Sequence, residues 1–361
     1  MREDALDWLA LSHCDGMGAV TVRKLVQHFG SAGAVLEASA YDLADISRIS
    51  DELARSIKAA DRDWADQQVA SCLRHLVDIV TFKDEAYPEL LSQTSSPPAI
   101  LFIKGDLSLL SLPTVAIIGA RNCSAYGRHV AREFAQDLAQ RGVCVVSGLA
   151  LGIDACAHEG ALRGGATAAV KGTGLDHPYP RTNQALFQQI GSEGLLISEF
   201  PMGTTADPKH FPRRNRTISG LSRSVVVVEG GRKSGSLLTA QYALEQNRDV
   251  FAVPGPVTSP KSLGPHHPIR QGAQLAQSAE DIAGELLDLR TSHQAARAPS
   301  QMPLTGVEGE IVACLSGEGA HVDTIADRIR RPAHEVLAIL LGLELTSRVT
   351  QLPGKQFVLK H

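Results

Sequence analysis

The chain is poor in aromatic residues and in cysteine, and it has no long apolar run. Of its 361 residues 4% are aromatic and six are cysteines. No stretch approaches the roughly 18 uncharged apolar residues of a membrane span, so we expect no membrane partner. The opening MREDALDWLALSHC carries acids early and lacks an apolar signal core. These absences predict a cytoplasmic chain.

The cysteines are scattered along the sequence, without a CxxC pair. They are Cys14, Cys72, Cys123, Cys144, Cys156 and Cys314. Because disulfide frameworks and zinc sites need closely spaced ligands, we expect neither. His266 and His267 are adjacent, which is a poor arrangement for two ligands on one helix face. We therefore expect no metal and no cofactor.

The overall composition indicates a folded chain of several domains. It is 43% hydrophobic and 20% charged, which is not the composition of a disordered chain. The length suggests two or three domains of about 150 residues each. Because the formal net charge is -4, any attraction to nucleic acid must come from a local basic patch.

The central region alternates apolar runs with amphipathic helices. The expected strands are 114–120, 143–147, 166–172, 195–199, 224–230 and 249–255. Continuous Val and Ile runs indicate strands that are buried on both faces. Strand–helix repetition then predicts an α/β fold with a doubly wound, mostly parallel sheet.

The first 80 residues have a helical composition with almost no strand alternation. Within them, Gly16 and Gly18 form a tight turn between two helical stretches, and we expect another short helix near residues 40–46. Free amides at such a turn are how a helix-hairpin-helix grips a DNA phosphate. A plain helical hairpin with a glycine turn fits the same residues, and both interpretations stay open.

The C-terminal region shows a change of pattern after Leu289. Residues 291–303 are polar and rich in Ala, Pro and Ser, which predicts a linker. Residues 304–361 have the order helix, helix, helix and β-hairpin around Pro353-Gly354, which is typical of a winged helix. The third helix, His334 to Glu344, is mostly apolar, so it favours docking or dimer packing over base reading. We divide the chain into domains at 1–80, 81–290 and 304–361, joined by this linker.

In open α/β sheets, ligands bind beyond the carboxyl ends of the strands. Gly119 and Arg121 directly follow the first central strand, where glycine allows close backbone approach and arginine pairs with phosphate. A surface arginine on a glycine turn is the plainer alternative. After the second strand, Asp154 could cap a helix. His158, followed by Glu159, is expected to be part of a structural or surface pair rather than a catalytic base.

The strongest local signal is the run KHFPRRNR at 209–216, with four positive charges in eight residues and no acid. Arginine pairing with phosphate, and base stacking on an aromatic ring, suit single-stranded nucleic acid. A solvated basic loop is the usual alternative. We expect a helix to open at Asn215 and Arg216, next to the binding edge of the sheet. The candidate residues of this run are Lys209, Phe211, Arg213, Arg214, Asn215 and Arg216.

Two further glycine-rich turns are candidates. Ser234 and Gly235 stand at a helix start after the fifth strand, which suits a phosphate or sugar oxygen. The turn at 172–174 lacks the third glycine of a dinucleotide fingerprint, since His177 stands there. No GxSxG elbow and no Ser/His/Asp set is evident, so hydrolase chemistry lacks a nucleophile.

These motifs together resemble the DNA-processing protein A (DprA, or Smf) family. They are VAIIGAR, SAYG, VVSGLALGID, AHEGAL, GTGLDHPYP, SEFPMG, FPRRNRTISGLS, VVVVEG, SGSLLTA and AVPG, in order from about Tyr87 to Ala273. The resemblance implies an extended Rossmann-like core between a small helical domain (helix-hairpin-helix or SAM type) and a winged helix. It also implies dimerisation, binding of single-stranded DNA, and loading of the RecA recombinase during natural transformation, without enzymatic turnover.

The resemblance also implies a DNA pocket. Its residues are Gly119, Arg121, Phe211, Arg214, Asn215, Arg216, Ser234 and Gly235, and charge adds Lys209 and Arg213. The chain departs from the family pattern at four places. Ala120 replaces a small hydroxyl residue, Lys171 an apolar one, His266 an asparagine and Pro268 a leucine.

Two other functions compete with this interpretation. One is a nucleotide phosphoribohydrolase of the related lysine-decarboxylase-like fold, whose PGGxGTxxE signature carries a carboxylate. The corresponding turn here reads EGGRKSGSLLTAQ, with Gln241 at the nearest later polar position and no acid after its first residue. The other is a duplex-DNA regulator that acts through the winged helix, which the apolar third helix disfavours.

Overall fold

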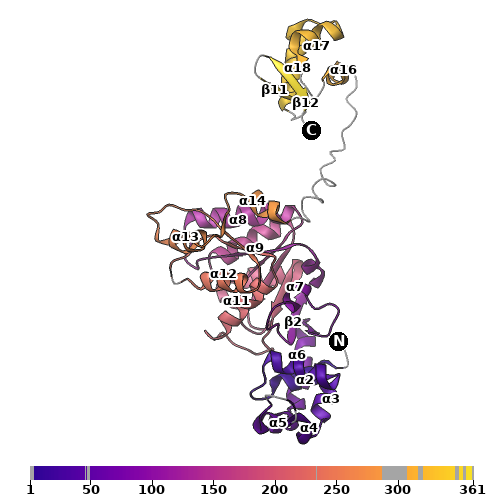
Figure 1. Cartoon of the computed structure of the whole chain (residues 1–361), viewed down its shortest axis with the longest axis vertical. Helices are drawn as coiled ribbons and strands as arrows, with labels where there is room; N and C mark the ends of the chain where they lie inside the picture. Colours follow the sequence, from indigo (N-terminus) through magenta and orange to yellow (C-terminus); the bar gives the residue numbers. More distant parts are fainter. Residues whose placement is uncertain are drawn as a thin grey trace. The chain divides into compact units, whose positions relative to one another are not determined.

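The computed structural model describes residues 4–44, 46, 49–232, 234–286, 307–315, 320–345, 349–352 and 355–359. It divides into two compact units, residues 1–293 and 294–361 (Figure 1). The predicted linker, 291–303, lies outside the described residues. Within the described part of the chain, no helix has both the length and the apolar character needed to cross a membrane.

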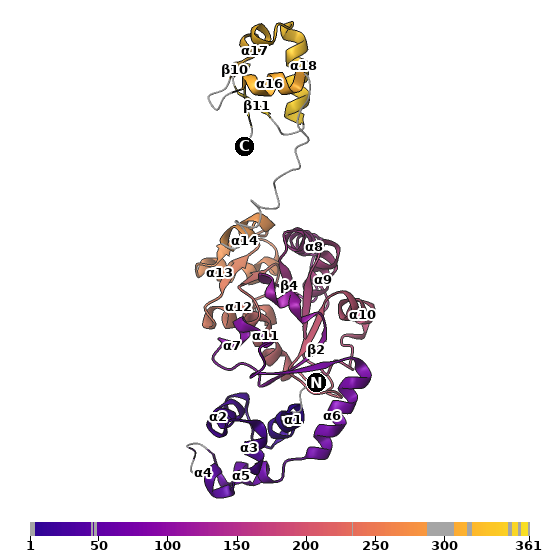
Figure 2. The same ribbon diagram turned by 90° about the vertical axis from the view of Figure 1, so that its right-hand side faces the viewer.

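The first unit begins with a bundle of short helices (Figure 2). They are α1 (Ala5–His13), α2 (Ala19–Phe29), α3 (Ala32–Glu37), α4 (Ala40–Ala44), α5 (Asp51–Lys58) and α6 (Arg62–His75). Ser31, Ser50 and Asp61 each accept a hydrogen bond from a backbone amide three residues on, which fixes the starts of α3, α5 and α6. Trp8 and Leu25 are buried in one cluster with Phe102 of the sheet, so bundle and sheet share a core.

A nine-stranded sheet follows. Its strands are β1 (Asp78–Thr81), β2 (Ile100–Gly105), β3 (Thr114–Ile118), β4 (Cys144–Ser147), β5 (Thr167–Lys171), β6 (Leu195–Ser198), β7 (Ser224–Val227), β8 (Asp249–Ala252) and β9 (Gln274–Leu275). Their order is β1-β2-β6-β5-β4-β3-β7-β8-β9. The six predicted strands are present and pair in parallel, which confirms the predicted fold class.

The sequence did not indicate the outer strands. β1 and β2 pair with each other and with β6 in antiparallel fashion. β1 crosses residue 80, so the expectation that the first 80 residues are helical is wrong at its end. The reason is tertiary: β1 is completed only by its register with β2, which lies some 20 residues further along the chain.

Helices cover both faces of the sheet, as Figure 2 shows for α8 and α9 on one side and α11 and α12 on the other. The helices of this part are α7 (Glu89–Ser92), α8 (Ala125–Gln140), α9 (Ile153–Gly164), α10 (Gln184–Glu193), α11 (His210–Gly220), α12 (Gly235–Glu245), α13 (Leu263–Arg270) and α14 (Ala279–Glu285). Phe134 of α8 and Ile282 of α14 share one core, whereas Ile218 of α11 and Ala243 of α12 share another. The sheet is therefore doubly wound.

The second unit is a winged helix. It contains α16 (Val307–Cys314), β10 (Ala320–His321), α17 (Val322–Ile329), α18 (Ala333–Leu345), β11 (Val349–Leu352) and β12 (Gln356–Leu359). The strands form an antiparallel sheet in the order β10-β12-β11. Val336, Leu340 and Leu343 of α18 are buried in its core, so much of that helix's apolar character serves packing. The predicted turn at 353–354 lies outside the described residues.

Candidate nucleic-acid interface

The predicted site lies where the strand order of the sheet reverses. β3 lies between β4 and β7. The helices that follow β3 and β4 cover one face of the sheet, and the helix that follows β7 covers the other. A crevice forms at such a switch point, beyond the carboxyl ends of the strands. The loop after β3 carries Gly119 and Arg121, and the loop after β7 leads to Ser234 and Gly235. Adjacent strand ends therefore bring together residues that are more than 100 positions apart.

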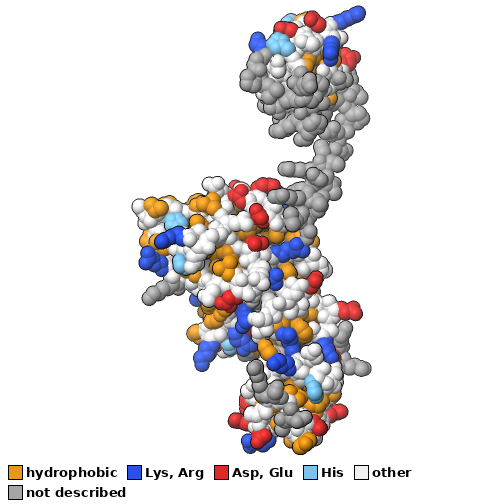
Figure 3. All heavy atoms as spheres, in the orientation of Figure 1, with side chains coloured by type: hydrophobic (Ala, Val, Ile, Leu, Met, Phe, Trp, Pro, Cys, Tyr) orange, Lys and Arg blue, Asp and Glu red, His pale blue; other side chains and the backbone are white. Residues whose placement is uncertain are grey.

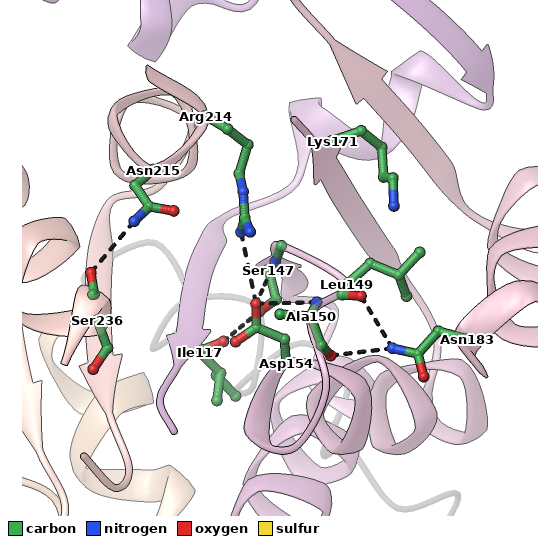
Figure 4. A network of polar contacts seen from close by, with 12 residues as sticks. Ile117, Ser147, Leu149, Ala150, Asp154, Lys171, Asn183, Arg214, Asn215 and Ser236 are labelled. Atoms are coloured by element: carbon green, nitrogen blue, oxygen red, sulfur yellow. Dashed lines mark hydrogen bonds and ion pairs between the residues drawn. The ribbon is translucent and has the colours of Figure 1, made fainter. Parts of the chain in front are cut away.

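The crevice contains a pocket of about 290 Å³. Seven of the ten predicted residues line it: Gly119, Arg121, Phe211, Arg214, Asn215, Ser234 and Gly235. Ser234 is the N-cap of α12 and its hydroxyl is 2.7 Å from that of Ser236. The Asn215 amide donates to the Gly235 carbonyl (3.3 Å), which ties α11 to the start of α12 (Figure 4).

Gly119 serves close packing at the base of this pocket. A Cβ at this position would lie 2.6 Å from Cγ1 of Ile153 and 2.8 Å from the carbonyl oxygen of Glu229. The neighbouring Ala120 amide donates to that same carbonyl (2.7 Å). Glycine is therefore needed here so that β3, α9 and the loop after β7 can meet.

Phe211 lies between cations. The guanidinium carbon of Arg121 is 5.3 Å from its ring centroid and that of Arg214 is 5.8 Å away. The Tyr179 ring lies 6.0 Å away, centroid to centroid. An aromatic ring between guanidinium groups can stack on a base while the arginines pair with phosphate. Arg121 is exposed, and its guanidinium has no hydrogen-bond partner among the described residues.

Arg214 and Asp154 form a buried ion pair below the pocket, with 3.7 Å between Nη1 and Oδ2 (Figure 4). The Asp154 carboxylate also accepts from the amides of Gly148 (3.2 Å) and Ala150 (3.4 Å). Burial raises the pKa of Asp154, and Arg214 opposes that shift; burial likewise lowers the pKa of Arg214. The interpretation of Asp154 as a helix cap is wrong, because Gly152 is the N-cap of α9.

The other basic residues of the run point elsewhere. Arg213 pairs with Glu199 (3.0 Å) and stacks over Phe200, and Arg216 donates to the Ser95 hydroxyl (3.0 Å). Lys209 is the exposed N-cap residue of α11. This helix begins at His210, so the expectation that it opens at Asn215 is wrong. The cause is that early arginines oppose the helix dipole, which made the segment resemble a loop.

His158 is fully buried, as expected for a structural residue. Its Nδ1 lies 2.7 Å from the Thr167 hydroxyl, and burial lowers its pKa to about 3. The imidazole is therefore neutral at ordinary pH. Among the described residues, no group of three or more His, Cys, Asp or Glu side chains is placed to hold a metal ion.

On the face seen in Figure 3, several Lys and Arg side chains gather around the position of α11. The local basic patch that an acidic chain needs for an anionic partner is therefore present. Two residues near the site were not among the ten candidates. Lys171 and Tyr179 line a second pocket, next to the first. The signals for them were the departure of Lys171 from the family pattern and the position of both residues at the end of β5 and in the loop after it.

Comparison with known proteins identifies the family. A profile for DNA recombination-mediator protein A matches residues 78–287, a DprA-like N-terminal HHH domain matches 2–66, and a DprA winged helix domain matches 295–355. The chain belongs to the DNA processing protein A family. It is 41% identical to Protein Smf of Escherichia coli over 283 residues, 76% of each chain.

Solved structures of family members agree with this assignment. The X-ray structure of DNA processing protein A (DprA) from Streptococcus pneumoniae has a TM-score of 0.71 at 36% identity, and covers 79% of this chain and 99% of that one. The Helicobacter pylori protein, described as having a unique single-stranded DNA binding mode, has a TM-score of 0.54 at 31% identity, with coverages of 59% and 96%. The N-terminal match decides for a helix-hairpin-helix over a plain hairpin.

Departures from the DprA family pattern are accommodated locally. His266 Nε2 lies 3.0 Å from the Gly255 carbonyl, so it holds the loop after β8. Pro268 lies inside the short helix α13 and is buried, and its carbonyl accepts the Gln271 amide (2.9 Å). Lys171, at the end of β5, is 2% exposed.

Proposed function

We propose that this chain binds single-stranded DNA in the crevice at the ends of β3 and β7. The observation that carries the proposal is the meeting of Arg121, Phe211, Asn215 and the start of α12 around one pocket. The guanidinium of Arg121 and the helix start suit a phosphate, and Phe211 suits an unstacked base. A duplex keeps its bases stacked on one another, so the aromatic contact favours single strands. The single-strand binding of the Helicobacter pylori relative supports the proposal.

The ten predicted residues have different roles in this proposal. Arg121 and Phe211 contact DNA directly, while Arg214 positions them from its pair with Asp154. Arg216 and Lys209 extend the basic surface beyond the pocket. Arg213 is neutralised by Glu199, so we assign it the weakest contribution.

The family resemblance supports the wider role. We propose a cytoplasmic homodimer that protects incoming strands and loads RecA onto them during natural transformation, with domains at 1–80, 81–290 and 304–361. We favour binding without turnover over a phosphoribohydrolase. Both carboxylates beside the pocket are engaged: Asp154 pairs with Arg214, and Glu229 accepts hydrogen bonds from the Ser124 amide (2.8 Å) and hydroxyl.

The test is fluorescence anisotropy of labelled single- and double-stranded oligonucleotides across a salt series. We expect preference for single strands, with a log–log salt slope of about −0.7 per phosphate contact. Arg121→Ala should weaken binding and make that slope shallower by about 0.7. The control is Arg163→Ala, an exposed arginine at the opposite end of α9 from the pocket. Unchanged affinity of the Arg121→Ala/Arg216→Ala double variant would contradict the site.

A further inference from the structure

Lys171 is a buried cation at the end of β5. It is 2% exposed, and its ammonium donates to the Tyr179 carbonyl while lying 5.4 Å from the Phe187 ring centroid. No ion pair of this lysine is found in the described part of the chain. A buried lysine without a carboxylate is costly, and an ammonium has three donors, of which the Tyr179 carbonyl engages one. An anion beside this ammonium would satisfy the other two donors, which have no partner among the described residues.

The second pocket is where that anion fits. Lys171, Arg121 and Arg214 line it together with Tyr179 and Phe211, in a volume of about 50 Å³. This space is several times what one water requires. Three cations face it, against the single carboxylate of Asp154 behind Arg214. Figure 4 shows the Lys171 side chain directed toward Leu149.

We propose that Lys171 binds a phosphate oxygen of single-stranded DNA in this second pocket, a contact peculiar to chains with lysine at this position. The proposal rests on the proposed function. Arg121, Arg214, Phe211 and Ala150 line both pockets, so the two are neighbours and successive groups of one strand can occupy them. Lys171 thereby adds a phosphate contact that an apolar residue would not supply.

The contact is linked to a proton. Burial, and secondarily Arg214, lowers the pKa of Lys171 to about 7. A bound phosphate favours the charged ammonium, so DNA binding takes up a proton above pH 7. The other titratable or charged side chains around Lys171 are Arg121, Asp154, His158, Tyr179, His210 and Arg214. His158 is neutral throughout this range.

The test compares single-strand affinity at pH 6 and pH 8 for the full chain and for Lys171→Leu and Lys171→Met. For the unaltered chain we expect affinity to fall by up to about tenfold between these values, as one coupled proton allows. Both variants should bind single strands more weakly than the unaltered chain at pH 6, with a salt slope shallower by about 0.7 and with less change in affinity between the two pH values. Lys104→Leu, which removes a half-buried lysine of β2 outside both pockets, is the control.

Three outcomes overturn the proposal, and they are distinguishable. If the unaltered chain binds single strands, loses binding on Arg121→Ala, and shows the same pH profile as both position-171 variants, the Lys171 contact is wrong and the proposed function stands. If the chain does not bind single strands, both are wrong. If the pH effect occurs with oligo-dT but not with oligo-dA, Lys171 contacts a base edge and the phosphate assignment is wrong.

Discussion

Removing the Asp154 carboxylate should destabilise the first unit strongly. Asp154 and Arg214 have side chains that are 8% and 7% exposed, so both charges have lost nearly all their hydration. Their mutual attraction and the two loop amides offset that loss in the native chain. Asp154→Ala would leave a buried guanidinium without a counter-charge. Breaking a buried pair from one side costs about 3–5 kcal/mol, and we expect that loss in the free energy of unfolding.

A double variant separates the energy of the Asp154–Arg214 ion pair from the effect of changing each side chain by itself. Replacing both partners by apolar residues of similar size is often close to neutral, because no charge remains to be desolvated. Asp154→Leu/Arg214→Met should therefore lose less free energy of unfolding than Asp154→Leu or Arg214→Met alone. The coupling should be at least about 1 kcal/mol, as for contacting residues in a double-mutant cycle.

Urea unfolding monitored by tryptophan fluorescence measures this effect. The chain has two tryptophans, Trp8 and Trp64, and both lie in the first unit, so the signal excludes the winged helix. Trp8 belongs to the core that bundle and sheet share, which couples it to the site. The reasoning is refuted if each single variant costs less than about 1 kcal/mol, or if the double variant costs the sum of the two.

Three further variants test other parts of the structure. Phe211→Ala should raise the dissociation constant for single strands by about 5- to 150-fold, the equivalent of 1–3 kcal/mol of base stacking, while Phe211→Trp stays near the unaltered chain in anisotropy titrations. Gly160→Ala should lower the free energy of unfolding by about 1–3 kcal/mol in urea, because a Cβ there would collide with the Arg132 carbonyl where α9 meets α8. His158 has a folded pKa of about 3, below its unfolded value of 6.5, so its contribution to stability is complete above pH 6.5 and is lost as the pH falls. Between pH 6.5 and 5 the loss should approach about 1.4 kcal/mol per pH unit, and His158→Gln should show a flatter dependence in the same urea assay.

The six inner strands were predictable because each is buried on both faces. Such strands are continuous apolar runs, for example the Val225–Val228 stretch, and need no partner to be recognised. β2 begins two residues after Pro98, and it is completed only by antiparallel pairing with β1 and β6. β9 has two exposed residues, so it leaves no apolar pattern at all. A strand is therefore predictable from the sequence when its own residues form a continuous apolar run, and not when it depends on a distant partner strand.

The site was predictable in position but not in the roles of its arginines. Strand ends and residue types located the crevice, whereas the Asp154–Arg214 pair joins positions 60 residues apart and has no local signature. Because α11 begins at His210, the arginines of the basic run lie on a helix and point in different directions. From there, Phe211, Arg214 and Ile218 recur at helical spacing and face the pocket, while Arg213 and Arg216 are turned to Glu199 and Ser95. The helical spacing thus places Phe211 and Arg214 at the crevice and Arg213 and Arg216 on the outer surface of α11. Arg121, from a different loop, is the exposed cation beside Phe211, and its guanidinium has no hydrogen-bond partner in the described residues. Substitution of Arg121 should therefore reduce DNA affinity without disturbing the fold.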